Sequence, residues 1–384
     1  MYLLGPTSDR LDEGAGSSPR GPLLVQLYDV VRTAHLERIV DRPGTVVLYR
    51  SRRYDFDESI AGRVDLRRAG VVGAFVYGLR HRIDVIEINE PFIARAAPRS
   101  LAVILGARLR AAVTRSPRAR VVTYAIASLD PRDLFDVLPA RARWRGRLHQ
   151  LLVPAVWSFV DRIAYGTSLA RSLYRARFGR SRAQPTATLV PALPVRADEP
   201  LPAVAEPTIV FLGDLSERKG FVDVLDAWPI VARHVPEARL RIIGRGVGED
   251  AACDLAAADD AVTVDIDPPR PVIFAALREA KVLTLPSRRR PLWREQVGLP
   301  IVEGLARGCE IVTTPETGLA EWLDQHGHAV VTEAESLADA LVGALRSTRS
   351  PSDIVADLPP VDGRVAAHDW LMDDAIRADE GGRR

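Results

Sequence analysis

Short apolar runs alternate along the chain with longer segments in which apolar side chains recur at helical spacing. After Phe221, for example, Val224, Leu225, Trp228 and Val231 fall on one face of a helix. Since strands that alternate with helices are typical of parallel sheets with βαβ crossovers, the pattern predicts an α/β fold. The predicted strands are 2–4, 46–49, 83–88, 120–126, 162–166, 186–190, 208–213, 240–246, 262–267, 282–287, 310–314 and 330–331. The predicted helices are 22–40, 71–79, 101–113, 148–160, 221–231 and 361–376, and the polar segment 51–68 is interpreted as a variable excursion.

A polar, proline-rich segment at 192–202 separates two such series of strands and helices. A chain of 384 residues is also long for one domain, since domains typically contain roughly 150 residues. We therefore predict an N-terminal domain at 1–196, a linker at 197–206, a C-terminal domain at 207–350 and a tail at 351–384.

The composition is that of a folded globular protein, with 47% hydrophobic and 27% charged residues. The longest strongly apolar run, 151–160, is much shorter than the about 20 residues that span a bilayer, and the first residues lack the features of a signal peptide. The two cysteines, Cys253 and Cys309, have no metal-binding or disulfide spacing. We therefore expect a cytoplasmic protein.

The net charge of +2 hides an asymmetry between the two halves of the chain. The first 200 residues contain 32 Arg and 19 Asp or Glu, a difference of +13, whereas the rest contain 20 Lys or Arg and 31 Asp or Glu, a difference of −11. Trp144, Tyr174 and Phe178 lie among the arginines of 140–147 and 171–182. Nucleic-acid binding is disfavoured because no recognition motif accompanies these stretches. Contact with an anionic membrane surface or a lipid-linked acceptor fits better, and scattered solvated arginines are the alternative.

Two carboxylates in the C-terminal half, Glu295 and Glu303, stand eight residues apart. Pro300 suits the first position of a helix between them. The amides of Gly298 and Leu299 would then lie at the N-terminus of that helix, where a phosphate can bind. An ordinary amphipathic helix after a loop is the alternative interpretation.

A turn from Gly213 to Gly220 follows the apolar strand 208–213 and contains Arg218 and Lys219. A cation fixed in such a turn, as Lys219 would be, favours an anionic group of a ligand. The alternative is a charged turn that caps the following helix. Four further arginines, Arg288, Arg289, Arg290 and Arg294, come directly before Glu295 and favour an anionic ligand over a solvated loop.

These two motifs, in this order, closely resemble those of the family 4 retaining glycosyltransferases over residues 206–335, and the earlier part of the chain resembles that family loosely. The resemblance implies the GT-B fold, in which two facing Rossmann-like domains with parallel sheets enclose a deep interdomain cleft. It also implies transfer of a hexose-type sugar from a UDP- or GDP-sugar to a glycan or lipid-linked acceptor, with retention of configuration and without metal or cofactor. The tail helix at 361–376 would pack back on the N-terminal domain, and the enzyme would work in the cytoplasm, in peripheral contact with the inner face of the membrane.

The resemblance also assigns roles to residues of the C-terminal domain. Glu295 would contact the donor sugar at the reacting face, Glu303 would bind the ribose hydroxyls, and the Gly298 and Leu299 amides would bind phosphate. Lys219, assisted by Arg218, would stabilise the departing diphosphate. Gly213 and Arg294 complete the predicted donor site. Asp214 departs from the family pattern, which has a second cation there, so Arg218 or one of the arginines before Glu295 would replace that cation.

In the N-terminal domain the resemblance assigns fewer residue roles. Gly14 and Gly16 would form a glycine loop that faces donor and acceptor. Tyr124 stands near the position of a histidine that often lines the family's active site.

Three alternatives to this interpretation remain open. Two Asp-x-Asp triplets, at 55–57 and 265–267, are also a pattern that holds a divalent metal on a sugar diphosphate, although chance occurrence is expected with so many aspartates. A non-catalytic relative that binds a sugar nucleotide or a glycan is compatible with Asp214 and Tyr124. An oxidoreductase is disfavoured because the glycines at 244–248 do not complete a dinucleotide fingerprint.

Overall fold

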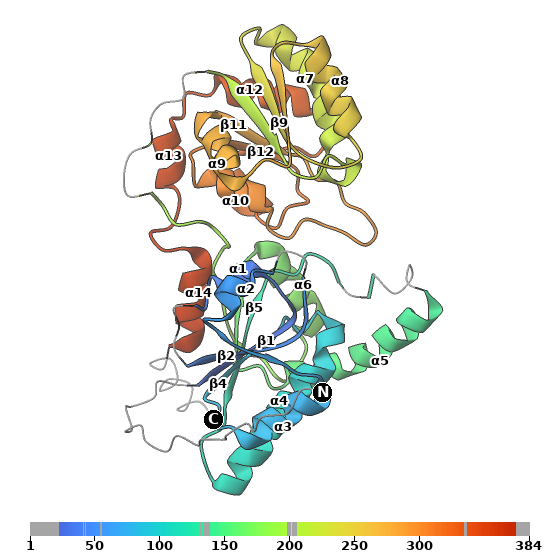
Figure 1. Ribbon diagram of the computed structural model, residues 1–384, viewed down its shortest axis with the longest axis vertical. Coiled ribbons are helices and arrows are strands. Elements are labelled where there is room, and N and C mark those ends of the chain that lie inside the picture. Colours follow the sequence, from blue (N-terminus) through green and yellow to red (C-terminus); the bar gives the residue numbers. More distant parts are fainter. Residues whose placement is uncertain are drawn as a thin grey trace, which may run out of the picture.

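The computed structural model describes residues 23–40, 42, 44–53, 56–130, 132–133, 139–197, 201, 206–333 and 336–373. These residues form two α/β domains, one above the other in Figure 1, each built around a sheet of parallel strands. Among the described residues, no helix combines the length and hydrophobicity needed to cross a bilayer.

The N-terminal domain has a seven-stranded parallel sheet in the order β3-β2-β1-β4-β5-β6-β7. Its strands are β1 (Leu24–Val31), β2 (Thr45–Arg52), β3 (Asp65–Arg68), β4 (Val85–Glu87), β5 (Arg120–Ala125), β6 (Arg162–Tyr165) and β7 (Thr186–Leu189). Its helices are α1 (Thr33–Leu36), α2 (Glu58–Ala61), α3 (Val71–Arg80), the 3-10 helix η1 (Ala94–Ala96), α4 (Ala97–Thr114), α5 (Ala140–Trp157) and α6 (Ser168–Phe178). The reversal of strand order beside β1 brings the carboxyl ends of β1 and β4 to one edge, where ligands bind in sheets of this kind.

The prediction of one helix over 22–40 is wrong, because the segment begins with the strand β1 and only the short α1 (Thr33–Leu36) is an α-helix there. The β1 residues Leu24, Val25, Leu27 and Val31 are all buried, since β1 lies between β2 and β4 in the sheet. A parallel strand covered on both faces is apolar throughout and does not alternate. A short run of this kind therefore cannot be told from a buried helix by periodicity alone.

Two other parts of this domain differ from the sequence-based expectations. The segment 51–68 is not only an excursion, because it contains α2 and the edge strand β3, which pairs with β2. The helices expected at 101–113 and 148–160 begin earlier, at Ala97 and Ala140, so α5 takes in the arginine-rich stretch 140–147. The strand predicted at 2–4 lies outside the described residues.

The C-terminal domain has a six-stranded parallel sheet in the order β10-β9-β8-β11-β12-β13. Its strands are β8 (Thr208–Leu212), β9 (Arg239–Gly244), β10 (Val262–Ile266), β11 (Val282–Leu285), β12 (Glu310–Thr313) and β13 (Ala329–Val330). Its helices are the 3-10 helix η3 (Glu217–Lys219), α7 (Phe221–His234), α8 (Glu249–Ala258), α9 (Arg270–Glu279), α10 (Leu299–Leu305), α11 (Ala320–Gln325) and α12 (Leu337–Arg346).

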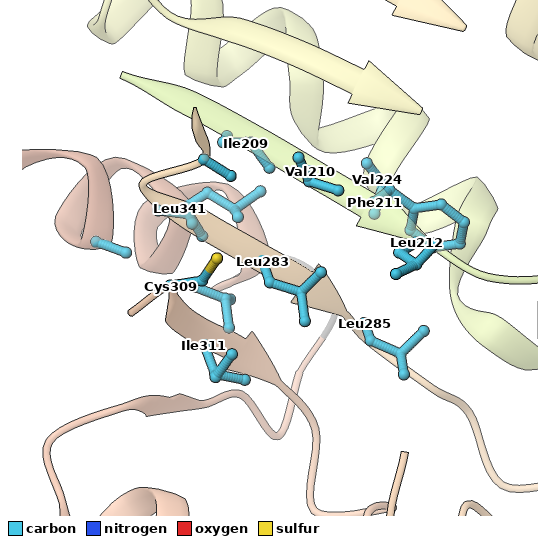
Figure 2. Packing of buried hydrophobic residues seen from close by; sticks show 14 of the residues in the cluster. Ile209, Val210, Phe211, Leu212, Val224, Leu283, Leu285, Cys309, Ile311 and Leu341 are labelled. Carbon is cyan, nitrogen blue, oxygen red and sulfur yellow. The ribbon is translucent and has the colours of Figure 1, made fainter. Parts of the chain in front are cut away.

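The core of this domain lies between the central strands and the helices on the two sides of the sheet. Figure 2 shows Ile209 and Phe211 of β8 next to Leu283 of β11, with Leu341 of α12 and Val224 of α7 packed nearby. All five side chains are buried, with at most 1% exposed. This core gives the loops at the carboxyl ends of β8 and β11 a rigid base, and those loops carry the candidate site.

The last described elements are α13 (Pro351–Ala356) and α14 (Gly363–Met372). α14 lies beside the lower sheet in Figure 1, where Ala367 and Leu371 pack against Val122 and Ala164 of β5 and β6. The chain therefore crosses from the C-terminal domain back to the N-terminal domain.

Candidate active site

The centre of the candidate site is an ion pair between Lys219 and Glu295, in which Lys219 Nζ donates to Glu295 Oε2. Both side chains are only 13% exposed. Lys219 ends η3, directly after β8, and Glu295 lies in the loop between β11 and α10. Two residues 76 positions apart in the sequence thus meet because β8 and β11 are neighbours in the sheet.

The turn at 213–220 contains Lys219 and is called the lysine turn. Gly220 holds this turn against the end of β11. Its φ is +72°, in the left-handed region, and a Cβ there would lie 2.0 Å from the carbonyl oxygen of Pro286. Only glycine allows both the conformation and this close approach of two backbones. The Lys-Gly sequence therefore sets the position of the Lys219 ammonium.

Trp293 lies under both cations of the lysine turn. Lys219 Nζ is 5.0 Å and Arg218 Cζ is 4.9 Å from the centroid of its ring, distances at which an aromatic face attracts a cation. No sequence motif predicts a role for Trp293, and its position two residues before Glu295 is the only signal for it in the sequence. Arg218 also forms an ion pair with Asp214 at 3.1 Å, so the residue that departs from the family pattern binds its neighbouring cation.

The arginines before Glu295 mostly have carboxylate partners. Arg288 pairs with Asp223, Arg290 with Glu217, and Arg294 with Glu316 at 2.8 Å. Arg294 Nη2 also donates to the carbonyl oxygen of Pro315 at 2.9 Å. Among the described residues, none makes a hydrogen bond or ion pair with Arg289. The family pattern has a cation where this chain has Asp214. Its replacement by Arg218 or by one of these four arginines stays a prediction.

The second glutamate of the pair, Glu303, lies on α10 and accepts a hydrogen bond from Arg270 Nη2 at 3.0 Å. Burial raises the pKa of its carboxyl, and Arg270 and Arg307 oppose that shift. Gly298 begins the helix with a φ of +79°, and Leu299 is 62% exposed. Binding of ribose by Glu303 and of phosphate by the Gly298 and Leu299 amides remain predictions.

A cleft of about 1550 Å³ opens between the two domains. The C-terminal domain contributes residues 292–296, which include Trp293, Arg294 and Glu295. The N-terminal domain contributes Arg50 of β2, residues that follow β4 and β5, and the first half of α5. The two walls also touch, since Ser128 Oγ donates to the carbonyl oxygen of Arg294 at 3.1 Å.

The predicted site residues therefore fall into groups. Glu295 and Arg294 line the cleft, whereas Lys219 adjoins it through its ion pair with Glu295. Gly213, Arg218, Gly298, Leu299 and Glu303 belong to the same domain but are not part of the cleft lining.

Tyr124 is not among the cleft residues. Its ring packs beneath the guanidinium of Arg364 on α14, 4.1 Å from Cζ to the ring centroid, and burial raises its pKa to about 12. This position gives no support to an acceptor-side role. Gly14 and Gly16 lie outside the described residues.

Glu90 lines the cleft, although no sequence motif predicts it. Its two carboxylate oxygens accept hydrogen bonds from the amides of Ile126, at 2.8 Å, and Ala127, at 2.9 Å. Burial raises its pKa to about 7, against the effect of these two hydrogen bonds. The carboxylate therefore holds the loop after β5, which includes Ser128, in place on the cleft wall. An acidic residue just after a buried strand was the signal for it.

The Asp-x-Asp triplets show no sign of a metal site in the parts of the chain that the structure describes. Asp265 pairs with Arg241 at 2.7 Å and Asp267 with Arg245 at 3.1 Å. Within those parts, no three His, Cys, Asp or Glu side chains form a group that could hold a metal ion. Asp55 lies outside them.

Comparison with known proteins agrees with this architecture. Residues 206–347 match the family described as glycosyl transferases group 1. The phosphatidyl-myo-inositol mannosyltransferase of Mycolicibacterium smegmatis is 29% identical over 179 residues, which are 43% of this chain and 42% of that protein. The chain thus matches about two fifths of the length of this curated relative.

Solved structures are similar over most of both chains. The lipopolysaccharide outer core galactosyltransferase WaaB superposes with a TM-score of 0.64 at 12% identity, over 93% of this chain and 99% of that one. Anabaena HepE, in complex with UDP and glucose, gives a TM-score of 0.55 at 12% identity, over 94% and 98%. At these identities the likeness shows the fold, which is the α/β GT-B fold. The C-terminal domain, at residues 206–347, thus matches glycosyl transferases group 1, and the chain as a whole has the fold of GT-B glycosyltransferases.

Proposed function

We propose that this protein transfers a hexose-type sugar from a nucleoside diphosphate donor to a glycan or lipid-linked acceptor, without metal and with retention of anomeric configuration. The donor would bind the C-terminal domain, and the acceptor would enter the cleft from the N-terminal side. In the reaction the bond between the anomeric carbon and the diphosphate oxygen breaks, a bond between that carbon and the oxygen of an acceptor hydroxyl forms, and the proton of that hydroxyl passes to the departing diphosphate.

The observation that supports this proposal best is the placement of Lys219 and Glu295 at the edge of the interdomain cleft. A lysine held by a glycine turn and an aromatic ring is a fixed cation, which stabilises the charge of a departing diphosphate without rearrangement. Glu295 lines the cleft itself, which supports a contact between its carboxylate and the donor sugar. The two domains would exclude water around them, which matters because hydrolysis competes with transfer.

The relatives support the choice of donor and acceptor. The structure of HepE contains UDP and glucose, and the mannosyltransferase relative is named for a phosphatidyl-inositol acceptor. By analogy we place this enzyme's donor among the UDP- and GDP-sugars. We also place the enzyme in the cytoplasm, at the inner face of the membrane when its acceptor is lipid-linked. Cofractionation with inner membranes would test that location.

Nucleotide binding by calorimetry is the first experiment, with UDP, GDP, ADP and NAD each tested in the presence of a chelator. Tight binding of one diphosphate that weakens in Lys219→Ala and Glu303→Ala would support the donor site and identify the base. Binding that requires a divalent metal would contradict metal independence. The anomeric configuration of the product, followed by NMR, tests retention.

A second candidate, a non-catalytic sugar-nucleotide-binding protein, is favoured by one observation. Asp214 stands where the family has a cation, and it pairs with Arg218. Such a protein would bind a nucleoside diphosphate in the same calorimetry but would release no diphosphate from any sugar nucleotide. Turnover measured with a panel of UDP- and GDP-sugars separates the two candidates.

A further inference from the structure

The N-terminal half of α5 forms one wall of the cleft. Arg141, Arg145 and His149 line the cleft and are spaced at i, i+4 and i+8, which places them in one row along the helix. Trp144 lines it too. In Figure 1, α5 extends away from the lower sheet, so its first half is not enclosed by other elements of the domain. This wall is therefore open to a ligand that enters from the side of the N-terminal domain.

The lining of the cleft carries a surplus of positive charge. Arg50, Arg95, Arg141, Arg145 and Arg294 face only two acidic residues of the lining. Those two, Glu90 and Glu295, are already used: Glu90 binds two backbone amides, and Glu295 pairs with Lys219.

Three of the five arginines that line the cleft form ion pairs with a carboxylate, and two do not. Arg294 pairs with Glu316, and Arg50 and Arg95 share Asp29, at 3.9 Å and 2.8 Å. Within the described part of the chain, no hydrogen bond or ion pair joins Arg141 or Arg145 to another residue. These two guanidinium groups therefore favour an anionic group of the ligand.

An apolar row runs along α5 beside the two arginines. Trp144, Leu148 and Leu151 are 68%, 46% and 75% exposed, and they are spaced at i, i+4 and i+7. Exposed apolar residues in such a row mark a binding surface, because single exposed residues are common but rows of them are not. A basic helix with an apolar row is typical of contact with an anionic amphiphile.

We infer that the acceptor is a phosphate-bearing amphiphile, whose phosphate binds Arg141 and Arg145 and whose apolar part lies along Trp144, Leu148 and Leu151. Two guanidinium groups one turn apart suit a phosphate, since each can form two parallel hydrogen bonds to its oxygens. A hydroxyl of the head group then reaches the part of the cleft lined by Glu295. The inference rests on the proposed transferase function and names the acceptor class of the same cleft.

The test is calorimetric binding of dihexanoyl phosphatidylglycerol, a soluble short-chain phospholipid, to the full chain without donor. Glycerol 3-phosphate serves as a free-phosphate probe and octyl glucoside as an uncharged amphiphile. We expect the phospholipid to bind more tightly than either probe. We expect the double variant R141Q/R145Q to weaken it by at least about tenfold, since hydrogen bonds to charged groups are lost. Trp144→Ala should weaken the phospholipid but not glycerol 3-phosphate.

The matched control is R143Q/R147Q, which removes the same charge from the same helix at positions that do not line the cleft. It should change phospholipid affinity less than about twofold, apart from general electrostatics that salt screens. Circular dichroism checks that both variants keep their helices. An equal loss in the two double variants would reduce the effect to a general basic surface and overturn the inference.

The remaining outcomes of the binding experiment also test the acceptor inference. Glycerol 3-phosphate that binds as tightly as the phospholipid would show a free-phosphate site, and no phospholipid binding would show no site; either result overturns the inference. Nucleotide binding is measured on the same samples and should be unchanged in R141Q/R145Q. If the nucleotide binds and the phospholipid does not, only the acceptor assignment is wrong. If the phospholipid binds and no nucleotide does, the proposed transferase function is wrong.

Discussion

The Lys219–Glu295 pair is formed by two charged side chains that are each only 13% exposed. Each partner offsets the desolvation of the other, so removal of one leaves a poorly solvated charge. The Trp293 ring adds a favourable surface for the ammonium. At the scale of single residues, the site is thus a coupled unit, and we expect its single variants to be non-additive.

The variant Lys219→Ala should lower kcat by about 10²- to 10³-fold, the effect of removing one group that stabilises developing charge. Steady-state assays with the donor that calorimetry identifies would measure it. Lys281 is the matched control, because it is the other lysine of the chain and its Nζ donates to the carbonyl oxygens of Leu345 and Ser347, away from the cleft. Lys281→Ala should cost stability and leave kcat near that of the parent. Parental kcat in Lys219→Ala would remove the lysine from the chemistry.

Glu90 should make stability depend on pH. Because burial raises its pKa to about 7, the folded protein holds a proton between pH 4.5 and 7 that the unfolded chain has released. The free energy of unfolding contributed by this group is therefore complete below that window and falls as pH rises through it, by at most about 1.4 kcal/mol per pH unit. The variant Glu90→Gln should lose this slope in urea unfolding at a series of pH values.

Other groups that titrate between pH 4.5 and 7 are present in both the parent and the Glu90→Gln variant. Burial lowers the pKa values of His35 to about 4 and His328 to about 3, which gives an opposite slope below about pH 6.5. That slope cancels in the difference between parent and Glu90→Gln. Glu58→Gln, at an exposed carboxylate on α2, should keep the parental profile. An unchanged profile in Glu90→Gln would mean that Glu90 is ionised throughout.

At the scale of elements, the sequence predicted the C-terminal domain more accurately than the N-terminal domain. Its strands end in glycines or polar turns that mark their limits, as at Gly213 and Gly244. The strand β1 has no such limits, and its buried residues occur at a spacing that also fits a helix. Only its neighbours β2 and β4 decide the question, and pairing between strands is not visible in local periodicity.

Gly220→Ala should destabilise the protein by about 2 kcal/mol or more, because an L-residue at φ +72° is strained and the new Cβ would meet the Pro286 carbonyl oxygen. Urea unfolding measures the change. The contrasting variant is Gly343→Ala in the middle of α12, where a Cβ meets nothing within 4 Å. It should stabilise the protein by about 0.5–1 kcal/mol. If both glycines behave alike, the close approach of the lysine turn to β11 is not a constraint.

For the whole molecule, the sequence motifs predicted candidate site residues of the C-terminal domain and, through the resemblance, an interdomain cleft, but not which residues of the N-terminal domain line that cleft. Glu90, Trp293 and Ser128 reach it from three separate segments, and Ser128 contacts the other domain through Arg294. Contacts of this kind depend on how two domains meet, and no local pattern records that. The arginine-rich stretch of α5 was recognised as basic, but its division into a cleft-lining row and an outer row required the helix to be placed.

The return of the chain to the N-terminal domain depends on two buried arginines. Arg162 has no exposed surface, and its Nη1 donates to the carbonyl oxygens of Trp370, at 3.2 Å, and Asp373, at 2.6 Å. Arg120 donates to those of Met372, at 2.8 Å, and Asp373, at 3.0 Å. Cations at the last carbonyls of α14 are favourable because that end of a helix carries partial negative charge. The C-terminal segment is thus bound to the sheet of the other domain by charge as well as by packing.

The variant Arg162→Gln should therefore lower the stability of the N-terminal domain by about 3 kcal/mol or more, since hydrogen bonds from a buried charge are lost. Thermal unfolding should then separate into two transitions, because only the N-terminal domain loses its contact with α14. Limited proteolysis should cut the chain near Trp370 earlier than in the parent. Arg118→Gln, two residues before β5 at an exposed position, should change stability by less than about 0.5 kcal/mol. A single parental transition and parental protease resistance in Arg162→Gln would show that Arg162 is not needed, and that Arg120 and the apolar packing of Ala367 and Leu371 suffice to hold α14 on the N-terminal domain.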